Sequence, residues 1–220
     1  MKLADKQFAV IGLGRFGMSV CQELQDSGTQ VLAIDLNEER VQAAASIVTQ
    51  GLIANCTSEE AVAELKLSDY DMVMVAIGSD INSSILTTLV LKEAGVKSVW
   101  VKANDKFHAK ILQKIGADHI IMPERDMGIR VARKMLDRRV LEFQPLGSGI
   151  AMTEIVVGAK LMTKQLSELS FYGAEGVQIL GFKRGSSVQA SPSGDQRLEI
   201  GDVVIVVGPE ATLVSKLKSL

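Results

Sequence analysis

The sequence predicts an α/β protein in two parts, a doubly wound parallel sheet followed by a smaller α+β lobe. Over the first two thirds of the chain, apolar runs alternate with helical patterns, as in repeated βα units. Several runs, such as residues 72–77, are apolar at every position, which is typical of strands covered on both faces. The 220 residues, 47% of them apolar, suffice for one full-sized domain and a small companion, each with its own core.

The first lobe is expected to contain six strands with five intervening helices. The candidate strands are residues 8–11, 30–34, 48–54, 71–77, 98–101 and 119–122. The first helix should pack one face on the sheet, because its small and apolar residues recur at helical spacing. These residues are Gly17, Val20, Cys21 and Leu24.

A helix from Glu124 to about Arg139 is expected after the sixth strand. Two apolar stripes predict that it is sandwiched between surfaces. The stripes are Met127, Val131 and Met135 on one side, and Ile129, Ala132 and Leu136 on the other. Because no aromatic residues interleave its basic side chains, they favour a solvated or ion-paired face over a nucleic-acid patch. The basic residues are Arg130, Arg133, Lys134, Arg138 and Arg139.

Pro145, Gly147 and Gly149 predict a linker at residues 141–148, between a first domain at 1–140 and a second lobe at 149–220. The second lobe is expected to contain short strands, a short helix, a hairpin or loop excursion and a terminal helix. These fall at residues 151–157, 177–183 and 203–207 for the strands, 164–169 for the short helix, 185–197 for the excursion, and from Glu210 for the terminal helix.

Composition argues against several classes of protein. The net charge of -2 and pI near 5.8 provide no overall attraction for nucleic acid or an acidic membrane surface. No apolar run approaches the roughly 20 residues that span a bilayer. Residues 1–7 lack the apolar stretch of a secretory signal, so a cytosolic protein is expected.

The cysteines and histidines do not predict a metal site or a disulfide. Cys21 and Cys56 form no CxxC motif and have no histidine at ligand spacing, so both are expected to be buried small residues. His108 and His119 do not complete a zinc site with them. A structural or ligand-contacting role is expected for the histidines instead.

A dinucleotide-binding fingerprint follows the first strand. Gly12-Leu13-Gly14-Arg15-Phe16-Gly17 matches GxGxxG and opens the first helix, which is the context the motif requires. The first glycine permits the tight turn, Gly14 lets a pyrophosphate approach the backbone, and Gly17 allows close helix packing. The helix N-terminus then favours a phosphate, so the first lobe is predicted to be a Rossmann-type nucleotide-binding domain.

Asp35 ends the second strand about 20 residues further on, where a carboxylate can accept hydrogen bonds from the ribose hydroxyls. A carboxylate at that position would repel a 2′-phosphate. NAD or an adenine mononucleotide is therefore favoured over NADP.

Residues at the ends of the other strands are further candidate contacts, because ligands of such sheets bind beyond the carboxyl ends of the strands. They are Leu36, Asn37, Asn55, Cys56, Ile77, Gly78, Ser79, Lys102, Ala103 and Asn104, with His108 able to reach the same crevice. An ordinary turn role is the alternative for each of them.

Two charged residues have more specific interpretations. Arg15, in the middle of the glycine motif, is placed to make bidentate bonds to phosphoryl oxygens, or is an exposed residue at a helix start. Glu124 follows Pro123 at a helix start. It either complements the helix dipole or binds a divalent cation near the phosphates.

The chain resembles the RCK family, the regulators of potassium conductance, and among them the bacterial Trk/Ktr potassium-uptake regulatory subunits. The resemblance covers nearly the whole chain. In the first lobe it rests on residues 10–17, Asp35, 54–57, 76–80, Asn82, 115–118, Pro123 and Glu124. In the second it rests on residues 166–169, 176–184, Pro192 and 198–208. The family often has Gly-Asp-Ala-Thr where this chain has Ala54-Asn55-Cys56-Thr57, which leaves base selectivity open.

The resemblance implies homodimers assembled into an octameric ring, peripheral to the cytoplasmic side of a membrane potassium channel or transporter subunit. It implies that ATP and ADP, or NAD(H), compete for the first lobe. In that scheme Arg15 senses a terminal phosphate across a dimer, and Glu124 belongs to a divalent-cation site for Mg or Ca.

For the second lobe, the resemblance implies a candidate cyclic di-AMP site at a dimer interface around Phe171, Tyr172, Val177 and Pro192. Core or dimer packing is the alternative role for these residues.

Regulation without catalysis is the favoured function, in which nucleotides shift the populations of two ring conformations. The alternative is a small NAD-dependent oxidoreductase, but the two histidines and the small second lobe offer no convincing acid–base set. A Rossmann-type transcription regulator is a third hypothesis. It lacks a recognisable helix-turn-helix segment.

Overall fold

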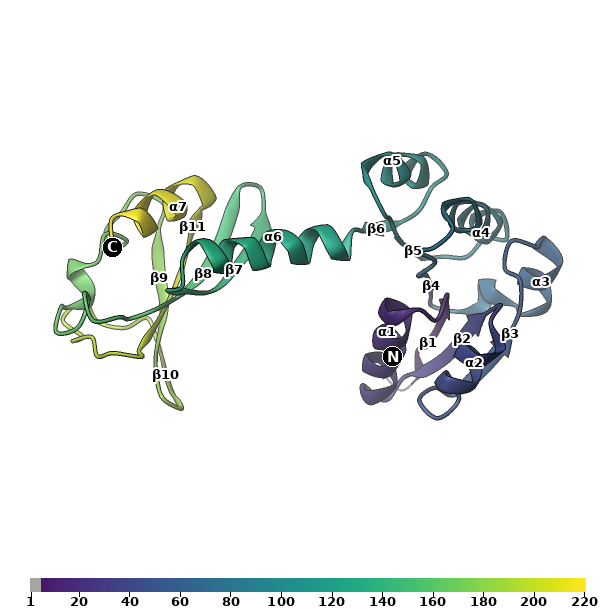
Figure 1. The fold of residues 1–220 in the computed structure, drawn as a ribbon, viewed down its shortest axis with the longest axis horizontal. Helices are drawn as coiled ribbons and strands as arrows, with labels where there is room; N and C mark the ends of the chain where they lie inside the picture. The colour runs from purple at the N-terminus through teal and green to yellow at the C-terminus, as the bar shows by residue number, and fades with distance from the viewer. Residues whose placement is uncertain (1–4) are drawn as a thin grey trace. The chain divides into compact units, whose positions relative to one another are not determined.

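The computed structural model describes residues 5–220, which divide into two compact units at Glu124/Arg125 (Figure 1). Residues 1–4, part of the segment expected to lack a secretory signal, lie outside the described residues. Among the described helices, none has the length and apolar character needed to cross a bilayer.

The described part of the first unit contains a parallel six-stranded sheet, which confirms the predicted strands with ends shifted by a few residues. The strands are β1 (Gln7–Ile11), β2 (Gln30–Asp35), β3 (Gln50–Ile53), β4 (Met72–Val75), β5 (Val99–Lys102) and β6 (His119–Ile121). Their order is β3-β2-β1-β4-β5-β6. The winding direction reverses between β1 and β4, and in such sheets a ligand crevice opens at that point.

Helices cover both faces of this sheet (Figure 1). They are α1 (Arg15–Asp26), α2 (Glu38–Ala44), α3 (Glu59–Glu64), α4 (Ile81–Glu93) and α5 (Lys106–Lys114), with a 3₁₀ turn at Leu67–Asp69. Because side chains alternate along a strand, β1 sends Val10 to one face and Ala9 and Ile11 to the other. The Val10 face packs against α1 and α2, and the other face packs against α3, α4 and α5.

The second unit is built on an antiparallel sheet of order β10-β9-β11-β8-β7. The strands are β7 (Val140–Gly147), β8 (Ile150–Val156), β9 (Gln178–Arg184), β10 (Ser187–Ala190) and β11 (Val203–Pro209). A 3₁₀ turn at Leu166–Glu168 stands where the short helix was expected, and α7 (Glu210–Lys218) is the predicted terminal helix. β9 and β10 form the predicted hairpin. Phe143, Phe171 and Val206 lie in the core of this unit.

The predicted linker at 141–148 is wrong, because these residues form β7 and its turn into β8. β7 is the last strand of the sheet, and proline is tolerated on an edge strand because one of its sides needs no ladder hydrogen bond. The register shifts between Pro145 and Gly147, and Gly147 and Gly149 adopt positive φ at the turn. The boundary lies earlier, at Glu124.

Helix α6 (Pro123–Leu136) departs from the prediction in two ways. It ends at Leu136, before Arg139, and none of its residues that the structure describes is buried, in contrast to the expected sandwich. Its basic face is ion-paired, as predicted: Arg130 and Lys134 pair with Glu142, and Arg133 pairs with Glu210. These pairs join the helix to β7 and α7 of the second unit.

Candidate nucleotide site at the carboxyl edge of the first sheet

Two glycines of the glycine loop, residues 12–17, are required by the backbone. Gly12 has φ +96° and donates its N–H to the carbonyl of Ile34 at 2.8 Å. A Cβ built on Gly17 would lie 2.0 Å from the carbonyl oxygen of Gly12, so α1 can approach β1 this closely only with glycine. A Cβ at Gly14 would meet no described heavy atom within 4 Å. The space in front of Gly14 is therefore open to a bound group.

Asp35 is part of the loop's own hydrogen-bond framework. Its Oδ2 accepts the Leu13 N–H at 2.7 Å and its Oδ1 accepts the Asn37 N–H at 2.9 Å. Arg40 lies 3.5 Å from Oδ2. A carboxylate has about four lone-pair positions, so Asp35 can hold the loop and still accept from a ribose hydroxyl.

A charged cluster lies at the ends of β5 and β6. The Nζ of Lys102 donates to Oε1 of Glu124 and stands 5.9 Å from the centre of the Phe16 ring. The hydrogen bond from Lys102, opposed by partial burial and assisted by the charge of Arg15, lowers the pKa of Glu124. Two cations and one carboxylate therefore act at the edge where the strands end, and the excess positive charge suits a phosphate.

The ends of β4 and β5 are linked by one side chain. Nδ2 of Asn104 donates to the carbonyl of Gly78 at 2.6 Å, and a Cβ built on Gly78 would lie 3.2 Å from Nζ of Lys102. The topology thus brings the predicted residues of these two strands together.

Four other predicted residues are exposed or partly exposed at the strand ends. Leu36 is 65% exposed, and Asn37 caps α2 by accepting from the Arg40 N–H at 3.1 Å. Oδ1 of Asn55 accepts from the backbone N–H and the hydroxyl of Thr57, and Ser79 is exposed. Asn37 and Asn55 therefore have the turn roles that were the alternative.

Three predicted contacts instead place their side chains in the core. Cys56 and Ala103 are buried, and Ile77 packs against the same cluster. Burial raises the pKa of the Cys56 thiol to about 12 and that of Cys21 to about 11, which agrees with the prediction that both are buried free thiols. At Cys56 and Ala103 only the backbone is available to a ligand.

His108 does not itself reach the crevice, because its side chain is only 2% exposed. Its Nδ1 accepts the N–H of Asn104 at 3.3 Å. Burial lowers the pKa of the imidazole against an opposing effect of Asp105, which favours the neutral ring. The buried ring of His108 therefore contacts the backbone of Asn104 from the core side.

The residues proposed for a second ligand differ in how deeply they are buried. Phe171 is fully buried in the core of the second unit, and Val177 is partly buried against that core. Tyr172 is 48% exposed, with its hydroxyl 2.5 Å from where a Cβ on Gly194 would be, and Pro192 is partly buried. Phe171 has the core role that was the alternative.

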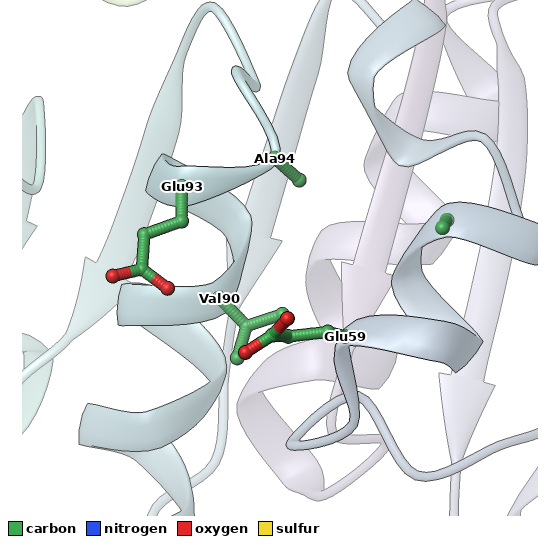
Figure 2. Close-up of a pocket in the computed structure, with 5 residues that line it drawn as sticks. Glu59, Val90, Glu93 and Ala94 are labelled. Carbon is green, nitrogen blue, oxygen red and sulfur yellow. The ribbon is translucent and has the colours of Figure 1, made fainter.

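Two further features bear on ligands. Across the described residues, no group of three or more His, Cys, Asp or Glu side chains is arranged to hold a metal ion. A cavity of about 230 Å³ lies between α3 and α4, lined by Glu59, Ala63, Val90, Glu93 and Ala94 (Figure 2). It contains none of the predicted site residues and presents two carboxylates, so it is no candidate for a phosphate.

Sequence reasoning missed two parts of the site, the Leu13 N–H and Arg40, both bound to Asp35. Arg40 follows Asp35 by five residues in the first turn of α2, a spacing from which it could have been found.

Known protein families account for both units. The TrkA-N domain model matches residues 8–123, and the TrkA-C domain model matches residues 152–218. The chain belongs to the TrkA-N/TrkA-C family. It is 70% identical over 220 residues to the Ktr system potassium uptake protein A of Vibrio alginolyticus, with 100% of both chains covered. It is 42% identical to the protein of the same description from Bacillus subtilis strain 168, covering 94% of this chain and 93% of that one.

Solved structures share the fold of this chain. The GsuK RCK domain matches with a TM-score of 0.54 at 18% identity, covering 98% of this chain and 47% of that one. The TrkA-N domain of the Escherichia coli inner membrane protein ybaL matches with a TM-score of 0.51 at 18% identity, covering 61% of this chain and 96% of that one. The family models and the Ktr relatives confirm the predicted resemblance to proteins of the Trk/Ktr type.

Proposed function

We propose that this TrkA-N/TrkA-C protein is the nucleotide-sensing regulatory subunit of a Ktr-type potassium uptake system. The observation that carries the proposal is the geometry of the glycine loop. Gly17 packs against the carbonyl of Gly12, and Asp35 accepts the Leu13 N–H. The charges of Arg15 and Lys102 act at the same edge of the sheet. The relatives described as Ktr potassium uptake proteins support the system, because they match 100% and 94% of this chain. Solved GsuK structures are described as bound to NAD and to ADP, which supports the ligand class.

The ligand is an adenine nucleotide, ATP or ADP, or NAD(H). Its ribose hydroxyls bind the remaining lone pairs of Asp35, and its phosphates lie at the N-terminus of α1 in front of Gly14. Arg15 and Lys102 neutralise the phosphates. The negative charge of Asp35 disfavours a 2′-phosphate, so NADP binds more weakly than NAD.

Glu124 is the proposed cation ligand. A phosphate that attracts Lys102 competes with Glu124 for the ammonium group and leaves the carboxylate, 69% exposed, free to bind Mg or Ca together with phosphate oxygens. The site is completed only by the nucleotide or a second copy, since Glu124 alone has too few oxygen ligands.

The proposed assembly uses the exposed apolar residues of α6. Met127, Ile129, Val131, Met135 and Leu136 are exposed large apolar residues. They form the proposed homodimer contact, and the dimers assemble into an octameric ring on the cytoplasmic side of a membrane potassium transporter subunit. ATP and ADP bind the two ring conformations with different affinities and so shift their populations.

For the second unit we keep cyclic di-AMP as a proposed inhibitory ligand. Tyr172, Val177 and Pro192 are the contact residues of that proposal, since their side chains are exposed or partly exposed. Phe171 would act from the core beneath them.

Calorimetry on the purified full chain tests the proposed function. We expect heat of binding with ATP, ADP and NAD and weaker binding of NADP. Arg15→Gln should weaken ATP binding more than ADP binding, because ATP carries the additional phosphate. If no adenosine phosphate or NAD binds, the proposal is wrong.

An oxidoreductase is the competing function. Sustained oxidation of NADH in the presence of carbonyl compounds, followed by the nicotinamide absorbance, would support it. We expect no turnover, because His108 is buried behind Asn104 and cannot exchange a proton with a substrate in the crevice.

A further inference from the structure

We infer that His108 is a positioning residue of the nucleotide site, which fixes Asn104 and, through it, the loop that follows β4. The inference rests on the proposed nucleotide site and assigns the residue that supports one wall of it.

The first turn of α5 directs the imidazole back toward the end of β5. Asp105 caps the helix, its Oδ1 accepting the N–H groups of Phe107 at 2.8 Å and His108 at 2.9 Å. With this turn fixed, His108 lies one helical turn after Asn104 and its Nδ1 accepts the Asn104 N–H at 3.3 Å. The backbone at Asn104 is thus held from behind by a buried ring.

Asn104 in turn joins two loops that the sheet does not join. The β4–β5 ladder runs from Val73↔Val99 to Val75↔Val101, so it ends before the loops begin. Beyond it, Nδ2 of Asn104 donates to the Gly78 carbonyl at 2.6 Å. Gly78 adjoins Lys102, so the spacing of the two loops also sets the surroundings of the phosphate-binding ammonium.

The position of the proton on the His108 ring agrees with a positioning role. Because Nδ1 accepts a hydrogen bond, the single proton of the neutral imidazole is on Nε2. Nε2 is buried and has no hydrogen-bond partner among the described residues. An unpaired buried donor is costly, and an apolar side chain would avoid that cost. The imidazole therefore contributes to the site through its acceptor, Nδ1.

Three variants separate positioning from core packing. His108→Leu keeps an apolar core and removes the acceptor, whereas His108→Asn places an oxygen where Nδ1 now lies. Leu112→Val, at a fully buried position one turn further along α5, is the control for destabilisation alone. The readouts are ATP affinity by calorimetry and Tm by thermal unfolding.

We expect His108→Leu to weaken ATP binding about fivefold, the effect of one lost hydrogen bond. His108→Asn should restore affinity to within about twofold of the parent protein. Leu112→Val should lower Tm without a comparable change in affinity. Wild-type affinity in His108→Leu, or no rescue in His108→Asn, would overturn the inference.

An NMR measurement on the nucleotide-free protein separates this inference from the proposed function. The ¹⁵N shifts of His108 should report a protonated Nε2 and a bare Nδ1, and His108→Leu should shift the amide resonances of Asn104 and Gly78. Unmoved Gly78 and Asn104 resonances would refute the positioning role even if ATP binds. Failure of the parent protein to bind any nucleotide would instead refute the proposed function, while this readout still reports on His108.

Discussion

At the residue scale, the glycines of the glycine loop differ in what the fold demands. Gly17 leaves no room for a Cβ against the Gly12 carbonyl, whereas Gly14 has an ordinary φ of −74° and open space around its Cα. Gly17 is therefore required for the packing of α1, whereas Gly14 leaves room for the proposed ligand.

Alanine substitutions test this division. Gly17→Ala should destabilise the first unit by at least about 2 kcal/mol, because a backbone contact of 2.0 Å cannot be relieved by a rotamer change. Gly14→Ala should change stability by less than about 0.5 kcal/mol but weaken ATP binding, because its methyl group occupies the phosphate approach. Urea unfolding and calorimetry give the two quantities. Tight ATP binding by Gly14→Ala would refute the proposed phosphate position.

The sequence predicted the glycine loop and Asp35 because their roles depend on local backbone geometry. It was less successful with Cys56, Ala103 and His108, whose side chains turn into the core. A residue that follows a strand can face the crevice or the core according to how the next turn bends. That direction is set by tertiary packing and is not encoded in the spacing of the motif.

At the scale of elements, an ion pair with a buried carboxylate joins Arg184 at the end of β9 to Asp202, the residue before β11. Arg184 donates to both carboxylate oxygens of Asp202, at 2.8 and 2.7 Å, and Asp202 also accepts the Glu199 N–H at 2.6 Å. Burial by itself would raise the pKa of Asp202, but these hydrogen bonds outweigh it and the pKa is lowered from its ordinary value of 3.8.

A pH dependence follows from that shift. Because the folded pKa lies below the unfolded one, the pair stabilises the second unit at pH values above the unfolded pKa. The contribution is lost as the pH falls through the folded pKa, below about 4. Asp202→Asn should be less stable than the parent protein at pH 7, and the difference should shrink in acid. Thermal unfolding between pH 3 and 7 measures it, and a constant difference would contradict the assignment.

The elements themselves were predictable where their pattern is local and periodic. The six strands of the first sheet and the β9–β10 hairpin appear close to their predicted positions. Pro145 and Gly147 predict a linker where β7 forms, because these residues are typical of both linkers and edge strands. The pairing of β7 with β8 distinguishes the two, and it is a tertiary interaction.

At the scale of the whole molecule, α6 begins in the first unit and continues into the second, with its apolar residues uncovered. Its two apolar stripes predict burial between surfaces. In the proposed homodimer, a second copy of the chain would supply such a surface.

A charged residue placed among the exposed apolar residues of α6 should weaken the proposed homodimer. Leu136, 86% exposed, makes few contacts within its own chain, so Leu136→Glu should leave the fold intact and disfavour a dimer by burying a charge. Sedimentation velocity should show a shift to smaller species. Val188→Glu, at a 65% exposed position on β10, is the matched control and should sediment like the parent protein.

The two cysteines lie on opposite faces of the first sheet, Cys21 on the buried side of α1 and Cys56 in the core beneath the helices of the other face. Both thiols are buried and protonated at neutral pH, so an alkylating reagent can reach each one only when its own layer of helices lifts. The reactivity of each thiol therefore reports local opening of the layer that covers it. Alkylation rates at the two sulfurs, with and without nucleotide, would measure how often each layer of helices opens.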